Sequence, residues 1–217
     1  MKKLTIRLET EKDYRKVENL TREAFWNVNV PGASEHYFVH VLRCHKDFVA
    51  ELDFVAELDG EIVGNIMYTK AWLKEENGTT KEIVSFGPLC VAPNHQRQGI
   101  GKMLIEHSFQ VARKLGYDTC VIFGSPANYA SSGFVSCRKK NVSCVVENNF
   151  PTAMLVAELT PNVLDGKKWI FVPSDADECC QDEDAVAQFD KTFPHKEKRW
   201  APTQEEFYIY SRSSVIR

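Results

Sequence analysis

Residues 83–115 read IVSFGPLCVAPNHQRQGIGKMLIEHSFQVARKL, and this stretch decides the fold of the chain. Its pattern predicts a strand over Ile83 to Val91, a polar turn over Ala92 to Gly101 and an amphipathic helix over Lys102 to Leu115. The apolar run Thr119 to Phe123 is typical of a buried parallel strand, so that the whole stretch predicts a right-handed βαβ unit. The helix side chains expected to be buried are Leu104, Ile105, Ser108, Phe109, Val111, Ala112 and Leu115.

The turn has the features of an anion-binding site. A helix start leaves its first backbone N–H groups unpaired, at the positive end of the helix dipole. Gly99 and Gly101 have no Cβ, so a phosphate can approach the main chain closely. Arg97 and Lys102 add two positive charges beside the same turn. The alternative is that the two glycines only make the turn tight.

Two common nucleotide-binding signatures do not fit this turn. Lys102 is followed by Met103 rather than by Ser or Thr, so the turn is not a Walker-type loop. Position 104 is Leu104, so no Gly-x-Gly-x-x-Gly motif is formed. A main-chain phosphate site for some other nucleotide is therefore a weak hypothesis.

Two motifs together resemble those of the GCN5-related N-acetyltransferases (GNAT family). The first is Leu89-Cys90-Val91-Ala92-Pro93 followed by Gln96-Arg97-Gln98-Gly99-Ile100-Gly101, which is similar to the family's acyl-CoA signature. The second is Tyr129-Ala130-Ser131-Ser132-Gly133-Phe134, which matches its Tyr-x-x-x-Gly-Phe motif. The resemblance implies an acetyltransferase domain over residues 1–160. Residues 161–217 resemble the C-terminal extension of a bacterial subgroup of predicted acetyltransferases, expected to pack on the core or on a partner subunit.

The resemblance implies an α+β fold with α/β/α layers. Its mixed central sheet would have about six to seven strands, splayed between the fourth and the fifth, with helices on both faces. The sequence fits, because Asp59-Gly60 separates two apolar runs and predicts a hairpin. Other predicted elements are a strand from Leu4 to Leu8, helices from Glu11 and Glu35 capped by Thr10 and Ser34, and final strands over Val142 to Val146 and Ala153 to Leu159.

In the family, the pantetheine arm of the cofactor enters the gap between the splayed strands. The resemblance therefore implies acetyl-CoA or coenzyme A as the acyl donor. Asn128 could hold a pantetheine amide or merely cap the next helix. The residues expected to bind the cofactor are Leu89, Cys90, Val91, Gln96, Arg97, Gln98, Gly99, Ile100, Gly101, Lys102 and Asn128.

Tyr129 is the expected catalytic residue, because it matches the position that many members use to protonate the leaving thiolate. The alternative is a tyrosine that only packs against the cofactor. The main-chain N–H of Cys90 or of Val91 is expected to meet the oxyanion. Cys90 as an acyl-carrying nucleophile is disfavoured, because no partnered histidine is evident.

The general base is left open by the sequence. Family members often use a glutamate on the fourth strand or a chain of waters. The remaining alternative is that solvent removes the proton of the amine. The side chains considered are Glu35, His36, His40, Glu82 and, through a water, Ser85.

Composition narrows the remaining possibilities. The 217 residues carry a formal net charge of −3, which gives no general attraction to nucleic acid or to an anionic membrane. We expect no membrane span and no signal peptide, because no apolar run is long enough. The seven cysteines lack metal-ligand spacing, so we expect no metal and reduced thiols in the cytoplasm. The acidic stretch Asp175 to Asp190 is interpreted as a solvated helix face.

The sequence therefore predicts an acetyl-CoA-dependent N-acetyltransferase, in which a primary amine attacks the thioester directly in a ternary complex. The acceptor would be a small molecule or an exposed amine, and the protein a monomer or a homodimer. The alternative is a sensor or assembly module that binds acyl-CoA without catalysis.

Overall fold

The computed structural model describes residues 4–144 and 149–216 of the chain. Its strands are β1 (Leu4–Leu8), β2 (Phe54–Leu58), β3 (Glu61–Lys74), β4 (Thr80–Val91), β5 (Thr119–Phe123), β6 (Val135–Ser136), β7 (Val142–Cys144), β8 (Met154–Glu158) and β9 (Trp169–Val172). Its helices are α1 (Tyr14–Phe25), α2 (Glu35–Leu42), α3 (Ile100–Lys114), α4 (Pro126–Tyr129), α5 (Glu183–Asp190) and α6 (Pro202–Arg212).

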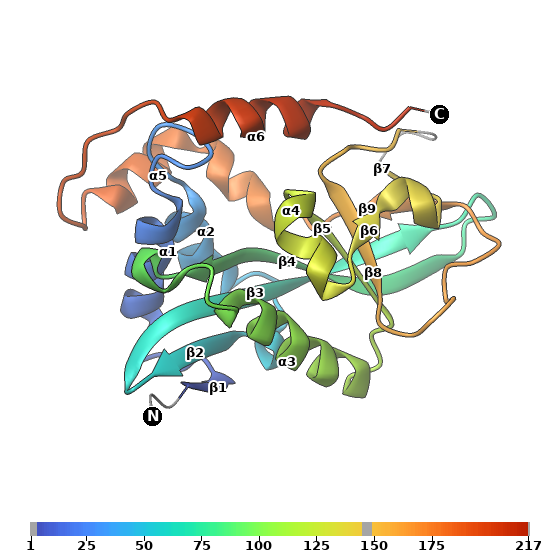
Figure 1. The fold of residues 1–217 in the computed structure, drawn as a ribbon, viewed down its shortest axis with the longest axis horizontal. Coiled ribbons are helices and arrows are strands. Elements are labelled where there is room, and N and C mark those ends of the chain that lie inside the picture. Colours follow the sequence, from blue (N-terminus) through green and yellow to red (C-terminus); the bar gives the residue numbers. More distant parts are fainter. Residues whose placement is uncertain (1–3, 145–148, 217) are drawn as a thin grey trace.

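One mixed sheet joins these strands (Figure 1). Strands β1 to β4 form an antiparallel meander, β5 runs parallel to β4, and β8 and β6 continue the sheet beyond β5. Strand β9 pairs with the second half of β3 and with β7. Among the described residues the sheet thus has nine strands rather than about six to seven, because the short strand β6 and the late strand β9 add to the predicted set.

The predicted hairpin between β2 and β3 is present. Asp59 has a φ of 52° and Gly60 a φ of 89°, as a two-residue hairpin turn with positive φ at both positions requires. Leu58 then pairs with Glu61 across the turn. A local signal in the sequence therefore sets the register of these strands.

Helices cover both faces of the sheet, in agreement with the predicted α+β fold. Successive strand residues point to opposite faces. Ala56 and Ile66 therefore face α3, whereas Val55 and Met67 face α1 and α2. Gly64 lets α3 pack closely, because a Cβ on it would lie 3.1 Å from Leu104 Cδ1.

Strands β4 and β5 are paired at one position only. Val84 lies opposite Cys120, and no later residue of β4 pairs with β5 in the part of the chain that the structure describes. Beyond this point the register of β4 with β3 shifts around Gly87-Pro88, which stand opposite a single residue of β3. The sheet is therefore splayed between its fourth and fifth strands, as predicted.

Several element boundaries differ from the sequence-based expectation. Helix α1 begins at Tyr14 rather than at Glu11, because the Asp13 N–H donates to the Thr10 carbonyl, three residues back, and the α-helical pattern starts only after it. The Asp13 carboxylate accepts hydrogen bonds from the N–H and the Oγ1 of Thr10. Helix α3 begins at Ile100 and ends at Lys114. Leu115 therefore lies past the helix and is 45% exposed, so its predicted burial was wrong.

The predicted final strands are found in β7 and β8. The predicted end of the first of them, at Val145 and Val146, lies outside the described residues. Strand β8 pairs along its whole length with β5, from Thr119 opposite Glu158 to Phe123 opposite Met154. This pairing places the start of β8 beside the end of β5.

The last part of the chain folds back over α1 and α2 (Figure 1). Arg22 of α1 is almost fully buried and pairs with Asp190 of α5 at 2.6 Å. Phe193 is 6% exposed and packs against the same part of α1, with the Arg15 guanidinium 3.5 Å from its ring centroid. The Trp26 Nε1–H donates to the Glu197 carbonyl at 3.0 Å.

No helix within residues 4–144 and 149–216 is long and apolar enough to cross a membrane. All seven cysteines lie in the described part of the chain and are free thiols. Cys90, Cys120 and Cys137 are buried.

Candidate functional site

The turn between β4 and α3 has an unusual backbone. Arg97 and Gly99 both have positive φ, 60° and 86°, and Gly99 stands at the N-cap of α3. Two glutamines brace the turn, because Gln96 Nε2 donates to the Val91 carbonyl and Gln98 Nε2 to the Asn94 carbonyl, each at 3.2 Å. These side chains hold the turn open from its outer side.

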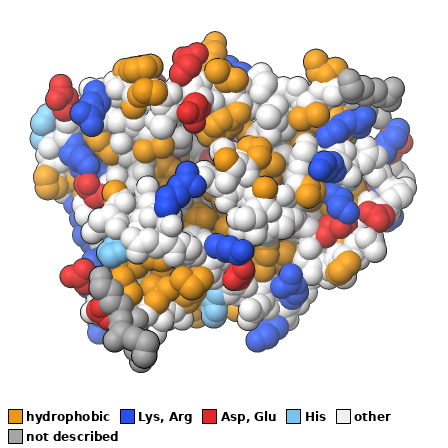
Figure 2. All heavy atoms as spheres, in the orientation of Figure 1, with side chains coloured by type: hydrophobic (Ala, Val, Ile, Leu, Met, Phe, Trp, Pro, Cys, Tyr) orange, Lys and Arg blue, Asp and Glu red, His pale blue; other side chains and the backbone are white. Residues whose placement is uncertain are grey.

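The turn presents a continuous row of free main-chain donors. Within the described residues, no backbone N–H from Gln96 to Lys102 donates to a protein oxygen, and the first bonded one is Met103 N, to the Gly99 carbonyl. The Ile100 side chain is buried in the core, so only its main chain faces the turn. Arg97 and Lys102 are exposed, and Figure 2 shows basic side chains near the centre of this face. Unpaired N–H groups at the start of a helix are suited to binding an anion.

The edge of β4 that faces the gap can be read from its ladder with β3. Ala92 N donates to the Val63 carbonyl at 2.8 Å, so these two residues form a hydrogen-bonded pair. Bonded and non-bonded pairs alternate in an antiparallel ladder. Cys90 therefore directs its N–H and C=O toward β3, whereas Leu89 and Val91 direct theirs toward the gap. Of the two N–H groups that the sequence left open for the oxyanion, this geometry favours Val91.

Tyr129 lies where the gap opens. Its ring centroid is 5.7 Å from that of Phe86 on β4 and 5.9 Å from that of Phe134. A Cβ on Gly124, just after β5, would lie 2.5 Å from the Tyr129 ring, so only glycine leaves room for this packing. Burial raises the pKa of Tyr129 to about 12, and the nearby phenol of Tyr210 adds to the rise. The phenol therefore stays protonated at neutral pH and can act as a proton donor.

The structure shows the surroundings of two further expected residues, Asn128 and Cys90. The Asn128 side chain is exposed on α4, and no hydrogen bond of its side-chain amide is present within the described residues. The Cys90 thiol is buried beneath α1, 3.5 Å from Thr21 Oγ1, and burial raises its pKa to about 11. A buried, protonated thiol is a poor nucleophile, which argues against an acyl-cysteine route.

The side chains considered as the base are engaged elsewhere. His36 is fully buried between Phe189 and Phe193, and this burial lowers its pKa to about 4. His40 Nδ1 lies 2.8 Å from a Glu18 carboxylate oxygen.

The two glutamates considered as the base are also engaged. The Glu82 carboxylate lies 3.6 Å from Lys70 Nζ and accepts a hydrogen bond from Tyr117. Glu82 precedes Val84, so it lies on the closed side of the gap. Glu35 accepts hydrogen bonds from Asn29 Nδ2 and from the Ser34 N–H.

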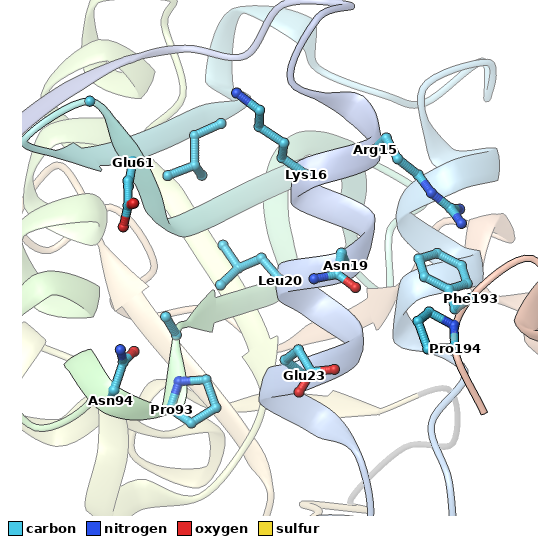
Figure 3. A pocket seen from close by; sticks show the side chains of 13 residues that line it. Arg15, Lys16, Asn19, Leu20, Glu23, Glu61, Pro93, Asn94, Phe193 and Pro194 are labelled. Atoms are coloured by element: carbon cyan, nitrogen blue, oxygen red, sulfur yellow. The ribbon is translucent and has the colours of Figure 1, made fainter. Parts of the chain in front are cut away.

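One cavity lies away from the gap. It has a volume of about 850 Å³ and lies on the other side of the β4–α3 turn, beside α1 (Figure 3). Arg15 and Lys16 of α1 line it together with Glu61 and Phe193. Pro93 and Asn94 form its border with the turn, so the cavity adjoins the row of N–H groups without containing it.

One aromatic side chain near the gap escaped the sequence reasoning. Tyr210 of α6 lies close enough to Tyr129 to influence its pKa, although the two are far apart in the sequence. The available signal was the spacing of Gln204, Phe207 and Tyr210, which places all three on one side of a helix.

Known proteins resemble the chain in sequence. The model of the acetyltransferase (GNAT) family matches residues 17–137. The uncharacterized N-acetyltransferase YjhQ of Escherichia coli (strain K12) is 31% identical over 86 residues, which are 40% of this chain and 47% of YjhQ. The match therefore spans about half the length of this curated relative.

Two solved structures resemble it in fold. The GNAT family N-acetyltransferase YhbS of Escherichia coli, in complex with CoA, gives a TM-score of 0.70 at 23% identity, covering 82% of this chain and 93% of that one. A GNAT family acetyltransferase of Brucella melitensis, in complex with acetyl-CoA, gives a TM-score of 0.61 at 24% identity, covering 80% and 97%. The two likenesses extend well beyond the β4–α3 turn.

Proposed function

Because the chain belongs to the acetyltransferase (GNAT) family, we propose that it transfers the acetyl group of acetyl-CoA to a primary amine. The observation that carries the proposal is the row of free N–H groups from Gln96 to Lys102, next to a strand edge that β5 leaves unpaired. One anion and one extended amide chain would satisfy these two sets of groups together.

The cofactor would bind mainly through the main chain. The diphosphate would accept hydrogen bonds from residues 96–102, with Arg97 and Lys102 at the margin. The pantetheine amides would pair with Leu89 and Val91, as an added strand does. Two proteins of similar fold hold CoA and acetyl-CoA in their crystal structures, which supports this choice of donor.

The reaction would proceed by direct attack in a ternary complex. The amine nitrogen forms a bond to the thioester carbon, and the Val91 N–H stabilises the negative charge that develops on the oxygen. The carbon–sulfur bond then breaks, and the Tyr129 hydroxyl donates its proton to the leaving thiolate. The nitrogen, which is positively charged after the attack, releases one proton to solvent, and Tyr129 recovers a proton from solvent.

The amine would lose its own proton to water. His36 is buried away from the gap, and Glu82 is paired on its closed side. A rate that rises with pH as the free amine becomes more abundant is therefore expected.

The seven free cysteines support a reducing compartment such as the cytoplasm.

Isothermal titration with acetyl-CoA tests the proposal, followed by a thiol-release assay across a panel of amines. We expect binding in the micromolar range and amine-dependent release of CoA thiol. If acetyl-CoA does not bind at high micromolar concentration, the proposal is wrong.

A non-catalytic acyl-CoA-binding protein is the second candidate. The observation in its favour is that His36, His40 and Glu82 all have partners away from the gap. Tight binding of acetyl-CoA without thiol release for any amine would select this candidate.

A further inference from the structure

Helix α6 is tied at its start to the segment that follows α1. Thr203 Oγ1 donates to the Val28 carbonyl at 2.7 Å, and Gln204 Nε2 donates to the Asn27 carbonyl at 3.1 Å. Helix α1 in turn contacts the end of β4, where Thr21 lies 3.5 Å from the Cys90 sulfur. The start of α6 is therefore anchored on the β4 side of the gap.

The end of α6 is tied to the segment that precedes β8. Thr152 N donates to the Ser213 carbonyl at 2.9 Å, and Val215 N donates to the Phe150 carbonyl at 2.8 Å. Met154, the first residue of β8, pairs with the last residue of β5. The end of α6 is therefore anchored on the β5 side, and the helix crosses from one side of the gap to the other (Figure 1).

The two faces of α6 differ in character. Gln204 is buried and Phe207 and Tyr210 are half-buried, with the last two rings in edge-to-face contact at 5.7 Å. Both hydrogens of the Gln204 amide are used, because it also donates to the Arg199 carbonyl at 3.0 Å. The inward surface that α6 leaves for a ligand is thus aromatic. Its acidic side chains, Glu205 and Glu206, are exposed.

We infer that α6 is a fixed roof over the acceptor side of the gap, with Phe207 and Tyr210 contacting an acceptor that is a small primary amine with an aromatic or other apolar body. The inference rests on the proposed acetyl transfer. The anchors at both ends carry α6 across the gap, and Tyr210, half-buried on its inner side, adds to the raised pKa of Tyr129.

The same roof excludes the side chains of folded proteins. A lysine presented on a protein brings its own main chain to the site, and that chain would have to occupy the space that α6 crosses. Opening the roof would break the hydrogen bonds at both of its ends. The aromatic inner surface also offers no carboxylate from α6 to a polycation such as spermidine.

The test is calorimetric titration of amines into the complex of the full-length protein with CoA, which mimics the donor after transfer. The probes are 2-phenylethylamine, tryptamine, 4-phenylbutylamine, spermidine and a lysine-containing nonapeptide. At least one arylalkylamine should bind, and spermidine and the peptide should bind at least tenfold more weakly. Tyr210→Ala should weaken the arylalkylamine about tenfold, because it removes a large aromatic contact.

Tyr208→Ala is the matched control, since Tyr208 lies on the same helix and is 54% exposed. It should leave amine affinity unchanged, and both variants should keep the affinity of the wild type for CoA. Thermal unfolding confirms that both are folded, and Tyr210→Leu, which also removes the aromatic ring, replaces Tyr210→Ala if the latter is not.

Three results would overturn the inference. The first is that the peptide or spermidine binds as tightly as the best arylalkylamine. The second is that none of the three arylalkylamines binds. The third is that the Tyr210 and Tyr208 variants change the affinity for the amine equally. A failure to bind CoA in the first titration would instead contradict the proposed function, on which the roof depends.

Discussion

On the donor side of the gap, residues 96–102 follow one another in the sequence and present main-chain N–H groups. On the proposed acceptor side, Phe207 and Tyr210 come from α6 and present side chains. A main-chain site needs a particular backbone, which two glycines and a helix start specify locally. A side-chain site assembled from distant segments needs the whole tertiary structure, and it can change its specificity without disturbing the donor side.

Tyr129→Phe is expected to have the largest effect, because this phenol stands between the two sides. Loss of a general acid should lower kcat by about 100-fold or more. The affinity for acetyl-CoA should stay the same, since the ring still packs on Phe86 and Phe134. Tyr117→Phe is the control, because burial also raises the pKa of Tyr117 to about 12 but its hydroxyl faces Glu82. Equal turnover of the two variants would refute the acid role.

Asp190→Asn should weaken the packing of α5 on α1 without affecting the donor side. It leaves the guanidinium of Arg22, whose side chain is 1% exposed, without its charged partner. We expect the free energy of unfolding to fall by about 3 kcal/mol in chemical denaturation, with unchanged affinity for acetyl-CoA.

The control for Asp190→Asn is Asp165→Asn, which breaks an ion pair with Lys140 at a site that is 58% exposed and should cost below about 1 kcal/mol. If Asp190→Asn instead weakened acetyl-CoA binding at unchanged stability, the contact between α5 and α1 would not be independent of the donor side.

Gly99→Ala should damage the donor side alone. Gly99 has a φ of 86°, where a Cβ costs about 1–2 kcal/mol, so we expect acetyl-CoA to bind about tenfold more weakly. Gly78→Ala is a close match, because Gly78 has a φ of 88° and lies in the turn before β4. It should lower stability to a similar extent with no change in binding. Equal affinity of both variants for acetyl-CoA would count against diphosphate binding by the main chain of residues 96–102.

Arg97→Ala should have the smallest effect, because the phosphates are held by main-chain groups. Its guanidinium is exposed, so we expect a two- to fivefold loss of affinity, or about 0.5–1 kcal/mol, that shrinks as salt is added. Titrations at low and high salt measure this. A loss beyond a hundredfold would show that the side chain, and not the main chain, is the principal anion ligand.

The sequence predicted the elements around the β4–α3 turn well because their determinants are local. The hairpin at Asp59-Gly60 and the βαβ unit from Ile83 to Phe123 are present, and the family resemblance is confirmed by the match over residues 17–137. Errors of local prediction are small, such as the exposure of Leu115 where α3 ends one residue earlier.

The acceptor side escaped the sequence because it depends on long-range contacts. His36 was considered as an acceptor-facing base, yet Phe189 and Phe193 cover it from more than a hundred positions away. The anchors of α6 are hydrogen bonds to the main chain at Asn27 and Phe150, for which no residue type is diagnostic. The sequence pattern of residues 161–217 does not indicate which surface of the molecule they will cover.

A crystal structure of the protein with bound acetyl-CoA tests the central claim most directly. We predict diphosphate oxygens at about 2.7–3.2 Å from the backbone nitrogens of residues 96–102, with the thioester sulfur beside the Tyr129 hydroxyl. A diphosphate bound instead in the cavity beside α1, on Arg15 and Lys16, would contradict the account.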